Sequence, residues 1–358
     1  MFFGDQHCQV SALTSVQTIS IEPGLGEQRL DRWLRGIFPH ITQGAIEKMC
    51  RKGELRVDGA RVKASTRVVA GQTVRIPPLG PRVGQPTPVI DKGPVNSADV
   101  AMIRSAVLYK DDDLIVLNKP PGLASQGGSG QGERHVDGLS RALTFGYKEP
   151  PKLVHRLDKD TSGLMILART DQVARRLSAA LRHRHVRKIY WAAVAGVPSP
   201  VKATIRYGLV KTGGRGEEQM RCVHPRDIDE TNGAKRAVTD YCVVETLGNR
   251  LAWVALSPVT GRTHQLRAHM AEIGHPIVGD GKYGGTGQHN PGDGWGAGAG
   301  PDLDRRLHLH ARTLILEHPV TRKRLTFTAP LPPHMKKTWE YVGWDERNAP
   351  ADPFAEAE

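Results

Sequence analysis

The sequence predicts an α+β fold, in which a small α/β domain precedes a large domain built around a mostly antiparallel mixed β-sheet with flanking helices. Segments with strand character outnumber helical patterns, and the two do not alternate regularly. This arrangement argues against a doubly wound sheet or an α/β barrel. A stretch rich in Pro and Gly over 77–99 interrupts the patterns and predicts a linker between two domains.

The chain of 358 residues is long enough for two or three domains of ordinary size. Composition divides it into five segments. They are an N-terminal extension (1–22), a small basic domain (23–80), a Pro/Gly-rich linker (81–100), a large domain (101–343) and a C-terminal tail (344–358).

The small domain begins with two helical patterns. Leu30, Trp33, Leu34 and Ile37 recur at helical spacing, and a second helix in GAIEKMCRKGE is expected to stop near Gly53. Short strand-like pieces follow in LRVDG, RVKAST and QTVRI. Because this region carries 11 Lys and Arg against five Asp and Glu, it is expected to be strongly basic.

The large domain is dominated by strand-like segments. They read AVLYK, LIVLNK, LMILA, KIYWAAVA, AVTDYCVVET and RLAWVALS. Two helices are expected, one through Val173 and Leu177 and one in HQLRAHMAEIG. The segment 284–300 is rich in Gly and predicts a surface loop.

Net charge is the most informative bulk property. The chain has 50 Lys and Arg against 37 Asp and Glu, a formal charge of +13 and a pI near 9.7. From 172 to 216 there are ten basic residues and no acid. Like charges repel one another, and a phosphate backbone relieves that repulsion, so nucleic acid is the expected partner. A basic enzyme without such a partner is the alternative.

Other compositional features exclude several classes of protein. No apolar run is long enough for a transmembrane helix, and the N-terminus lacks the features of a secretory signal, so a cytoplasmic protein is expected. The four cysteines, Cys8, Cys50, Cys222 and Cys242, have neither metal-ligand spacing nor a pairing pattern. They are expected to act as small hydrophobic residues, with no structural metal site.

The stretch VHRLDKDTSGLMILA (154–168) places a group of charges between apolar segments. A calcium loop starting at Asp158 would need a Glu at its twelfth position, where the chain has Arg169. A turn capped by Asp and Ser side chains explains Thr161 to Gly163 but leaves the charges near buried segments unexplained. The third interpretation is a catalytic site with one central carboxylate, which a nearby cation keeps ionised.

This stretch resembles the signature of the large-subunit ribosomal RNA pseudouridine synthases of the RluA/RluC/RluD type, within the RsuA/RluA family. Further matching motifs, in the family's order, are VLYKDDDLIVLNKPPGLASQGGSG, KIYWAAVAG, SPVTGRTHQLRAHMAEIGHPIVGDGKYGG and RLHLHARTL. The resemblance covers Val107 to Thr328, and LASQGGSG is most similar to the RluC branch. The small domain resembles the ribosomal-protein-type RNA-binding domain that many members carry.

The resemblance implies a fold and an activity. The large domain would be a pseudouridine synthase catalytic domain that isomerises specific uridines in 23S ribosomal RNA, without a cofactor or a metal. The reaction detaches uracil at N1 and rejoins it through C5, so one ionised carboxylate can suffice, as nucleophile at the ring or sugar or as base at C2′. The partner would be large-subunit ribosomal RNA or a pre-ribosomal particle, and the protein is expected to be a monomer.

The resemblance also assigns roles to residues. Asp158 would be the catalytic carboxylate, and Arg156 would enter the RNA helix where the target uridine leaves it. Tyr190, which its strand pattern alone would place in the core, would stack on the extruded base. Arg267 would pair with Asp158 instead of facing solvent as a helical Arg usually does.

Four further residues of these motifs receive lesser roles. His264 and His269 are interpreted as structural residues or RNA contacts, and Leu309 and His310 as walls of the pocket. One departure from the family's pattern is the length of the Gly-rich segment 284–300. Two rival hypotheses remain open, an inactive RNA-binding ribosome-assembly factor with the same fold and an RNA glycosylase that releases the base.

Overall fold

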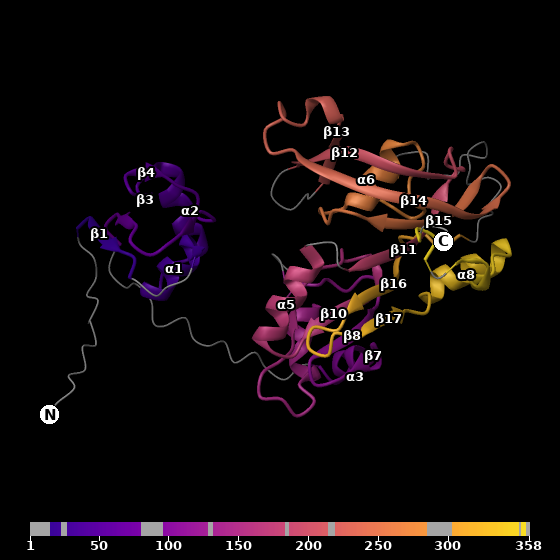
Figure 1. Ribbon diagram of the computed structural model, residues 1–358, viewed down its shortest axis with the longest axis horizontal. Coiled ribbons are helices and arrows are strands. Elements are labelled where there is room, and N and C mark those ends of the chain that lie inside the picture. Colours follow the sequence, from indigo (N-terminus) through magenta and orange to yellow (C-terminus); the bar gives the residue numbers. More distant parts are fainter. Residues whose placement is uncertain are drawn as a thin grey trace. The chain divides into compact units, whose positions relative to one another are not determined.

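A computed structural model of the chain describes 15–22, 27–79, 96–127, 132–182, 186–213, 219–284, 303–350 and 352–355. The expectations for most of the N-terminal extension, most of the linker and nearly all of the Gly-rich segment fall outside these residues. The chain divides into two compact units, a small unit (1–93) and a large unit (94–358) (Figure 1). No helix in the described ranges has the length and apolar character needed to cross a bilayer.

The small unit packs two helices beside short strands. Its elements are β1 (Gln17–Ser20), β2 (Gln28–Arg29), α1 (Leu30–Ile37), α2 (Gln43–Lys52), β3 (Arg56–Val57), β4 (Ala60–Arg61), β5 (Arg67–Val68) and β6 (Thr73–Ile76). Strands pair in the order β1-β6-β3-β4, with β2 and β5 as a separate pair.

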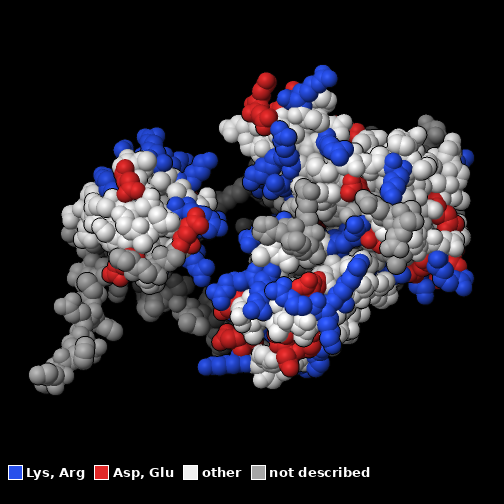
Figure 2. Space-filling model, viewed as in Figure 1, with Lys and Arg blue, Asp and Glu red and all other residues white. Residues whose placement is uncertain are grey.

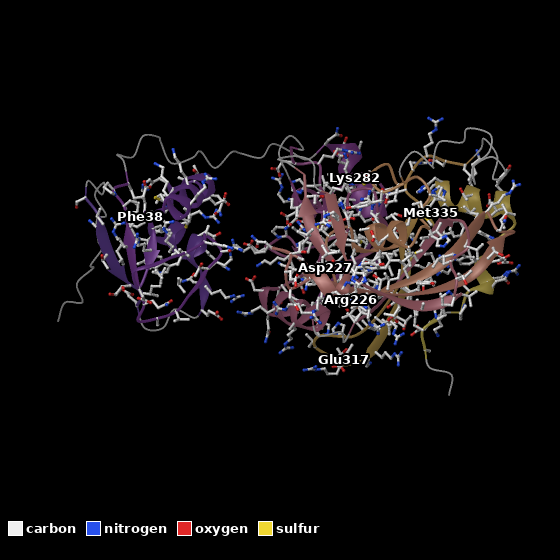
Figure 3. The ribbon with its side chains drawn as sticks, turned by 90° about the horizontal axis from the view of Figure 1, so that it is seen from above. Phe38, Arg226, Asp227, Lys282, Glu317 and Met335 are labelled. Carbon is white, nitrogen blue, oxygen red and sulfur yellow. The ribbon has the colours of Figure 1, made fainter. Side chains whose placement is uncertain are left out.

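The expected helices of the small unit are confirmed. Leu30, Trp33 and Leu34 of α1 are buried, and Phe38 lies inside the same core (Figure 3). α2 ends at Gly53, which adopts the left-handed conformation that Gly tolerates best. Of the strand-like piece RVKAST, only Arg61 belongs to a strand, so the prediction of a strand through Thr66 was wrong.

The large unit holds an 11-stranded sheet with flanking helices. Its strands are β7 (Val107–Lys110), β8 (Leu114–Lys119), β9 (Lys152–Leu153), β10 (Ser162–Ala168), β11 (Arg187–Ala195), β12 (Lys202–Thr212), β13 (Gln219–Val223), β14 (Lys235–Leu247), β15 (Leu251–Pro258), β16 (Leu309–Glu317) and β17 (Arg324–Thr328). Its helices are α3 (Ser97–Ser105), α4 (Val136–Leu139), α5 (Asp171–Arg182), α6 (Gln265–Glu272) and α8 (Pro333–Val342). The described residues also include the short 3₁₀ segments η1 (Ser140–Leu143), η2 (Pro225–Asp227) and η4 (Glu346–Asn348).

The main path of the sheet is β13-β12-β14-β15-β11-β16-β10-β8-β7. Every pair along it is antiparallel except β10 with β16, which run parallel. The predicted mostly antiparallel mixed sheet is therefore confirmed. The sequence patterns missed α3, α8, β12, β13, β16 and β17.

Alternation along β11 separates two cores on opposite faces of the sheet. Ile189, Trp191 and Ala193 pack with Trp253 of β15 and with α8, whose Met335 Figure 3 labels. The intervening residues of β11 pack on the other face, toward α6. Tyr190 therefore points away from the α8 core, to the face on which α6 lies.

The parallel junction between β10 and β16 depends on a glycine. Ser162 pairs with His310 and Gly163 with Ala311. Gly163 has a φ of +107°, and a Cβ there would overlap the backbone oxygen and nitrogen of Ala311. Only Gly permits both this conformation and this approach, so Gly163 fixes where β10 begins.

Substitution of Gly163 tests that constraint. Gly163→Ala is expected to cost at least about 3 kcal/mol of unfolding free energy, because backbone strain and a backbone clash add. Gly233 also has positive φ, +82°, but a Cβ there would meet no atom within 4 Å. Gly233→Ala, the matched control, should cost only about 1 kcal/mol in urea unfolding. Equal losses for the two variants would contradict the close approach of β10 to β16.

Two histidines are fully buried near the start of β16. His308 bonds Thr338 through Nε2 at 2.8 Å, and His310 bonds Ser162 Oγ through Nδ1 at 2.9 Å. Burial lowers the pKa of His308 to about 4 and the pKa of His310 to about 3. Both side chains are therefore neutral in the folded protein at neutral pH.

These histidines predict a loss of stability in mild acid. In the unfolded chain a His titrates near about 6.5, so below that pH the unfolded state binds more protons than the folded state. Unfolding free energy should fall as pH drops from about 6.5 toward 5, by up to about 1.4 kcal/mol per pH unit for each histidine. Urea unfolding across this window measures the slope. His310→Gln should reduce it, whereas His40→Gln, at an exposed position, should leave it unchanged.

Candidate active site

A cavity of about 1140 Å³ opens in the large unit where four loops and strands meet. Its wall includes residues of the loop 154–161, of β11, of the loop before α6, and of the segment 124–127. The volume slightly exceeds the usual range for a small-molecule pocket, about 300–1,000 Å³. Asp158, Arg156, Tyr190 and Arg267, the four residues singled out in the sequence, all line it.

Asp158 lies in the loop between β9 and β10, with 27% of its side chain exposed. The buried ammonium group of Lys119 binds backbone carbonyl oxygens in and near this loop. Nζ of Lys119 donates to the carbonyl oxygens of Pro120 at 3.0 Å, Leu123 at 2.7 Å and Lys159 at 3.0 Å. Burial lowers the pKa of Lys119 to about 7, while the charges of Asp160 and Asp158 oppose that shift.

Two further contacts fix the same loop. The hydroxyl of Ser125 donates to the carbonyl of Leu157 and accepts from its amide, at 2.6 and 3.0 Å. Nε2 of His155 accepts from the amide of Ile166 at 2.9 Å. These contacts explain why polar side chains such as His155 lie between buried segments, because they attach the loop to the sheet.

Tyr190 reaches the cavity because of an irregularity in β11. The register between β11 and β16 shifts between Ile189 and Tyr190, and Tyr190 then pairs with Ala311. Ala311 also pairs with Gly163 on its other side, so Tyr190 and the end of the Asp158 loop meet across one residue of β16. Burial, and then the charge of Asp158, raise the pKa of Tyr190 well above its usual range, so the phenol is neutral.

Arg267 is buried, contrary to the usual exposure of a helical Arg. Only 4% of the residue is exposed, and it forms a bidentate pair with Asp280, whose carboxylate accepts from Nε and Nη2 at 2.7 Å each. Nη1 lies 3.7 Å from Oδ2 of Asp158. The expected approach to Asp158 is present, but Asp280 is the nearer partner, and the sequence patterns did not identify it.

Arg156 is exposed at the mouth of the cavity. Among the described residues, Arg156 forms no ion pair with the nearby acid Asp160. His264 lies deeper, with Nε2 3.8 Å from Oδ2 of Asp158 and Nδ1 2.9 Å from the hydroxyl of Tyr283. The interpretation of His264 as a structural residue or RNA contact stays a prediction, and the structure adds that its side chain faces the central carboxylate.

Of the other residues to which the sequence analysis gave roles, one lines the cavity and two are buried in the core. Leu309 lines the cavity as expected, whereas His310 does not, because it is fully buried and bonded to Ser162. His269 is also fully buried, with Nδ1 3.0 Å from the hydroxyl of Thr239. Burial lowers the pKa of His269 to about 4, so it is a neutral core residue.

The lining of the cavity is strongly basic. Among the described residues that line it, two are acids, Asp158 and Asp160, and seven are basic, which are Arg156, Lys159, Arg182, Lys188, Arg262, Arg267 and Lys282. Figure 2 shows further Lys and Arg side chains on one face of the large unit, over α5 and over the β12–β13 end of the sheet. A cavity of this charge attracts a polyanion.

Part of the acid-free segment 172–216 contributes to the basic lining of the cavity. Arg182 and Lys188 line the cavity. Arg187 instead pairs with Asp352 at 3.0 Å, and Lys202 donates to the carbonyl of Pro353 at 3.2 Å. Arg187 therefore has a counter-charge from outside the segment, and Arg187 and Lys202 both bind the C-terminal residues 352–353.

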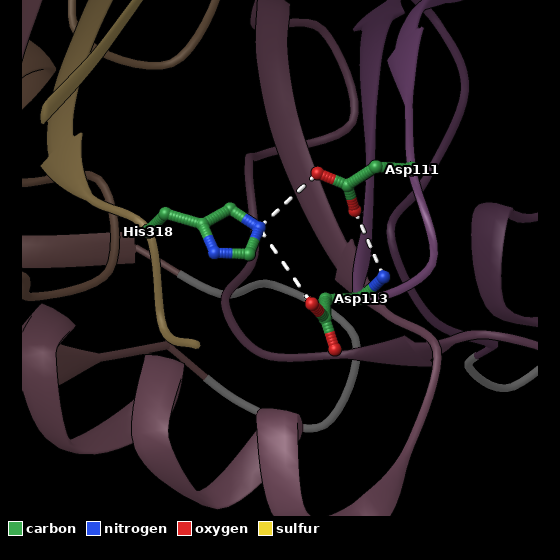
Figure 4. A group of neighbouring side chains, drawn as sticks. All are labelled: Asp111, Asp113 and His318. Atoms are coloured by element: carbon green, nitrogen blue, oxygen red, sulfur yellow. Dashed lines mark hydrogen bonds and ion pairs between the residues drawn. The ribbon is translucent and has the colours of Figure 1, made fainter. Parts of the chain in front are cut away.

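One group of side chains has the composition of a metal site. Asp111, Asp113 and His318 converge between the β7–β8 and β16–β17 turns (Figure 4). Nδ1 of His318 accepts from the amides of Val320 and Thr321, so the proton is on Nε2, which donates to Asp111 at 3.1 Å. An Nε2 that carries a proton has no lone pair for a metal, and the group is better explained as a hydrogen-bonded latch between two turns.

Comparisons with known proteins agree with this geometry. The family model of RNA pseudouridylate synthase matches 113–272, and that of the S4 domain matches 28–74. A relative from Vibrio cholerae, named ribosomal large subunit pseudouridine synthase C, is 35% identical over 326 residues, which cover 90% of this chain and 96% of the relative. A relative of the same name from Rickettsia bellii is 33% identical, covering 86% and 96%.

The comparison with solved structures leads to the same family. The human RNA pseudouridylate synthase domain containing 4 superposes with a TM-score of 0.55 at 30% identity, covering 68% of this chain and 95% of that one. The matched family segment includes Asp158, Tyr190 and Arg267. By its sequence, its fold and the residues gathered in its cavity, the chain belongs to the RNA pseudouridylate synthase family.

Proposed function

We propose that the protein converts uridine to pseudouridine in large-subunit ribosomal RNA, with Asp158 as the reacting carboxylate. The observation that carries this proposal is the convergence of Asp158, Tyr190 and Arg267 on one cavity lined by cations. The names of the relatives from Vibrio cholerae and Rickettsia bellii support the substrate and the RluC branch. All these groups come from a single chain, so a monomer is expected to be active.

The chemistry needs one ionised carboxylate. The bond from N1 to C1′ breaks, the base turns, and a bond from C5 to C1′ forms, while C5 loses a proton and N1 gains one. A carboxylate at position 158 can attack the sugar or the ring, or remove the C2′ proton. Each route uses the carboxylate, whose Oδ2 lies 3.7 Å from Nη1 of Arg267.

Tyr190 and Arg156 would handle the base and the RNA helix. The neutral ring of Tyr190 offers an apolar surface against which the extruded uracil can stack. Arg156 is exposed and free to enter the stack from which the uridine departs. Flipping a base costs a few kcal/mol, and a stacking guanidinium offsets part of that cost.

RNA docking would draw on charge in both units. The S4 match covers the basic strands and helices of the small unit, on which Figure 2 shows many Lys and Arg side chains. The cavity adds its own seven cations. Binding through phosphates should weaken steeply with added salt.

Release of tritium from uridine C5 tests the role of Asp158, because the new C5–C1′ bond displaces that hydrogen. With ribosomal RNA labelled at C5, Asp158→Asn is expected to lower release by at least about 10³-fold while RNA affinity stays within a few-fold of the wild type. Asp160→Asn, which changes the neighbouring acid, is the matched control and should retain most activity. Full activity of Asp158→Asn would contradict the assignment.

The same assay separates the rival hypotheses. An inactive assembly factor would bind the RNA without releasing tritium. A glycosylase would liberate free uracil, whereas an isomerase liberates none.

Arg156 is tested with two RNA substrates, one with the target uridine paired in a helix and one with it opposite an abasic site. Arg156→Ala should reduce kcat/KM on the paired substrate by about 10- to 100-fold, since the vacated stack is no longer filled. The loss should be much smaller on the abasic substrate, where little stacking has to be replaced. Arg262→Ala, which also removes a cavity cation, serves as the control. Equal losses on both substrates would reduce Arg156 to a phosphate contact.

A further inference from the structure

Arg267, Asp280, Tyr283 and His264 form a ring of contacts that begins and ends at the central carboxylate of Asp158. Arg267 and His264 both approach Oδ2 of Asp158, at 3.7 and 3.8 Å. Arg267 is paired with Asp280, and His264 is bonded to Tyr283. Asp280 and Tyr283 are themselves joined, because Oδ1 of Asp280 accepts the backbone amide of Tyr283 at 3.2 Å.

Asp280 sets the direction of the guanidinium. It takes Nε and Nη2 of Arg267, which leaves Nη1 as the end that faces Asp158. Asp280 is 1% exposed and follows Gly279, whose φ is +74° and where a Cβ would overlap the carbonyl of Arg306. The turn that carries Asp280 is therefore tightly placed against the segment before β16.

Tyr283 sets the tautomer of His264. Its hydroxyl oxygen accepts the amide of Met220 at 2.8 Å, and among the described residues the acceptor for its own hydrogen is Nδ1 of His264, 2.9 Å away. With Nδ1 as acceptor, the neutral imidazole carries its proton on Nε2, the atom that faces Asp158. His264 also has a left-handed backbone, with φ of +51°, a conformation found at functional sites.

The two N–H groups thus approach one oxygen of the carboxylate. Within the described residues, no hydrogen bond or ion pair occupies the other oxygen, Oδ1, and Asp158 lines the cavity. A carboxylate held at one oxygen cannot rotate freely about its last bond. The oxygen that remains is then presented to the nucleoside in a fixed direction.

We propose that Asp280, Tyr283 and His264 are positioning residues, which, with Arg267, hold Oδ2 of Asp158 and leave Oδ1 to react. The proposal rests on the role proposed above for Asp158. Contacts of 3.7 and 3.8 Å are longer than hydrogen bonds, but catalytic contacts often shorten to hydrogen bonds when the substrate binds. Loss of one donor to the charged carboxylate should then lower kcat by about 10- to 100-fold with little change in KM.

Replacement of His264 provides the first test, in the tritium-release assay with the full-length protein. His264→Gln places an amide N–H near the position of Nε2 and should retain most of kcat. His264→Leu keeps the bulk but removes the donor and should lose about 10- to 100-fold in kcat with KM within a few-fold. A purely structural role would make the two variants alike. His275→Leu, which changes a histidine bonded only to the backbone carbonyl of Ala195 in the described part of the chain, is the control.

The tautomer provides a test independent of activity. Nitrogen NMR of selectively ¹⁵N-His-labelled protein, with the His264 signal identified by its absence in His264→Gln, should show Nε2 protonated and Nδ1 bare. Tyr283→Phe should move this signal toward the other tautomer and lower kcat. Tyr241→Phe removes a phenol that bonds the carbonyl of Pro200 and should change neither. A wild-type His264 protonated at Nδ1 would overturn the part played by Tyr283.

Asp280→Asn keeps the size of the side chain and removes its charge. The kcat of Asp280→Asn should fall, and its thermal midpoint is measured in parallel. If Asp280 acts by orienting Arg267, Asp280→Glu should regain a larger share of the lost kcat than of the lost stability. Failure of the positioning proposal can be distinguished from failure of the proposed function. If Asp158→Asn is inactive while His264→Leu and Asp280→Asn keep wild-type kcat, the ring fails and the function stands; if Asp158→Asn is active, the proposed function fails first.

Discussion

The close approach of β10 to β16 is the constraint on which the site depends. Two strands can run side by side at that point only because Gly163 has no side chain to overlap Ala311. The approach places the Asp158 loop at the end of β10 and, on the other side of β16, Tyr190 of β11. An otherwise antiparallel sheet thus brings together, at its one parallel junction, residues that are far apart along the chain.

Electrostatics in the site follow a single rule, that each buried charge has a partner. Burial alone would disfavour the guanidinium of Arg267, but the hydrogen bonds and charge of Asp280, together with Asp158, raise its pKa. A buried Arg with a single exposed acid for a partner would be costly. Asp280 removes that cost, so Arg267 can face Asp158 without being neutralised by it, and the reacting carboxylate remains accessible in a basic cavity.

Sequence patterns predicted the strands whose buried side chains are mostly apolar. They missed strands that also bury polar and charged side chains. Segments such as 114–117 and 164–168 are continuous apolar runs, whereas β16 contains His310 and Arg312, which are buried through specific partners and break the pattern. The site residues came from motif resemblance, since spacing alone favours a core role for Tyr190. Asp280 was missed because it stands in a Gly-rich turn that resembles a loop, and its pairing with Arg267 is a tertiary contact that spacing along the chain does not reveal.

The buried ammonium of Lys119 has a mechanical consequence for recognition. It binds the carbonyl oxygens of Pro120 and Leu123 and, within the loop, that of Lys159 next to Asp158, so the backbone beside the carboxylate is restrained. When one partner of a complex is stiff, the other must deform. The nucleic acid then bears the distortion energy, and sites are discriminated by how cheaply they bend and open as well as by the bases they contain.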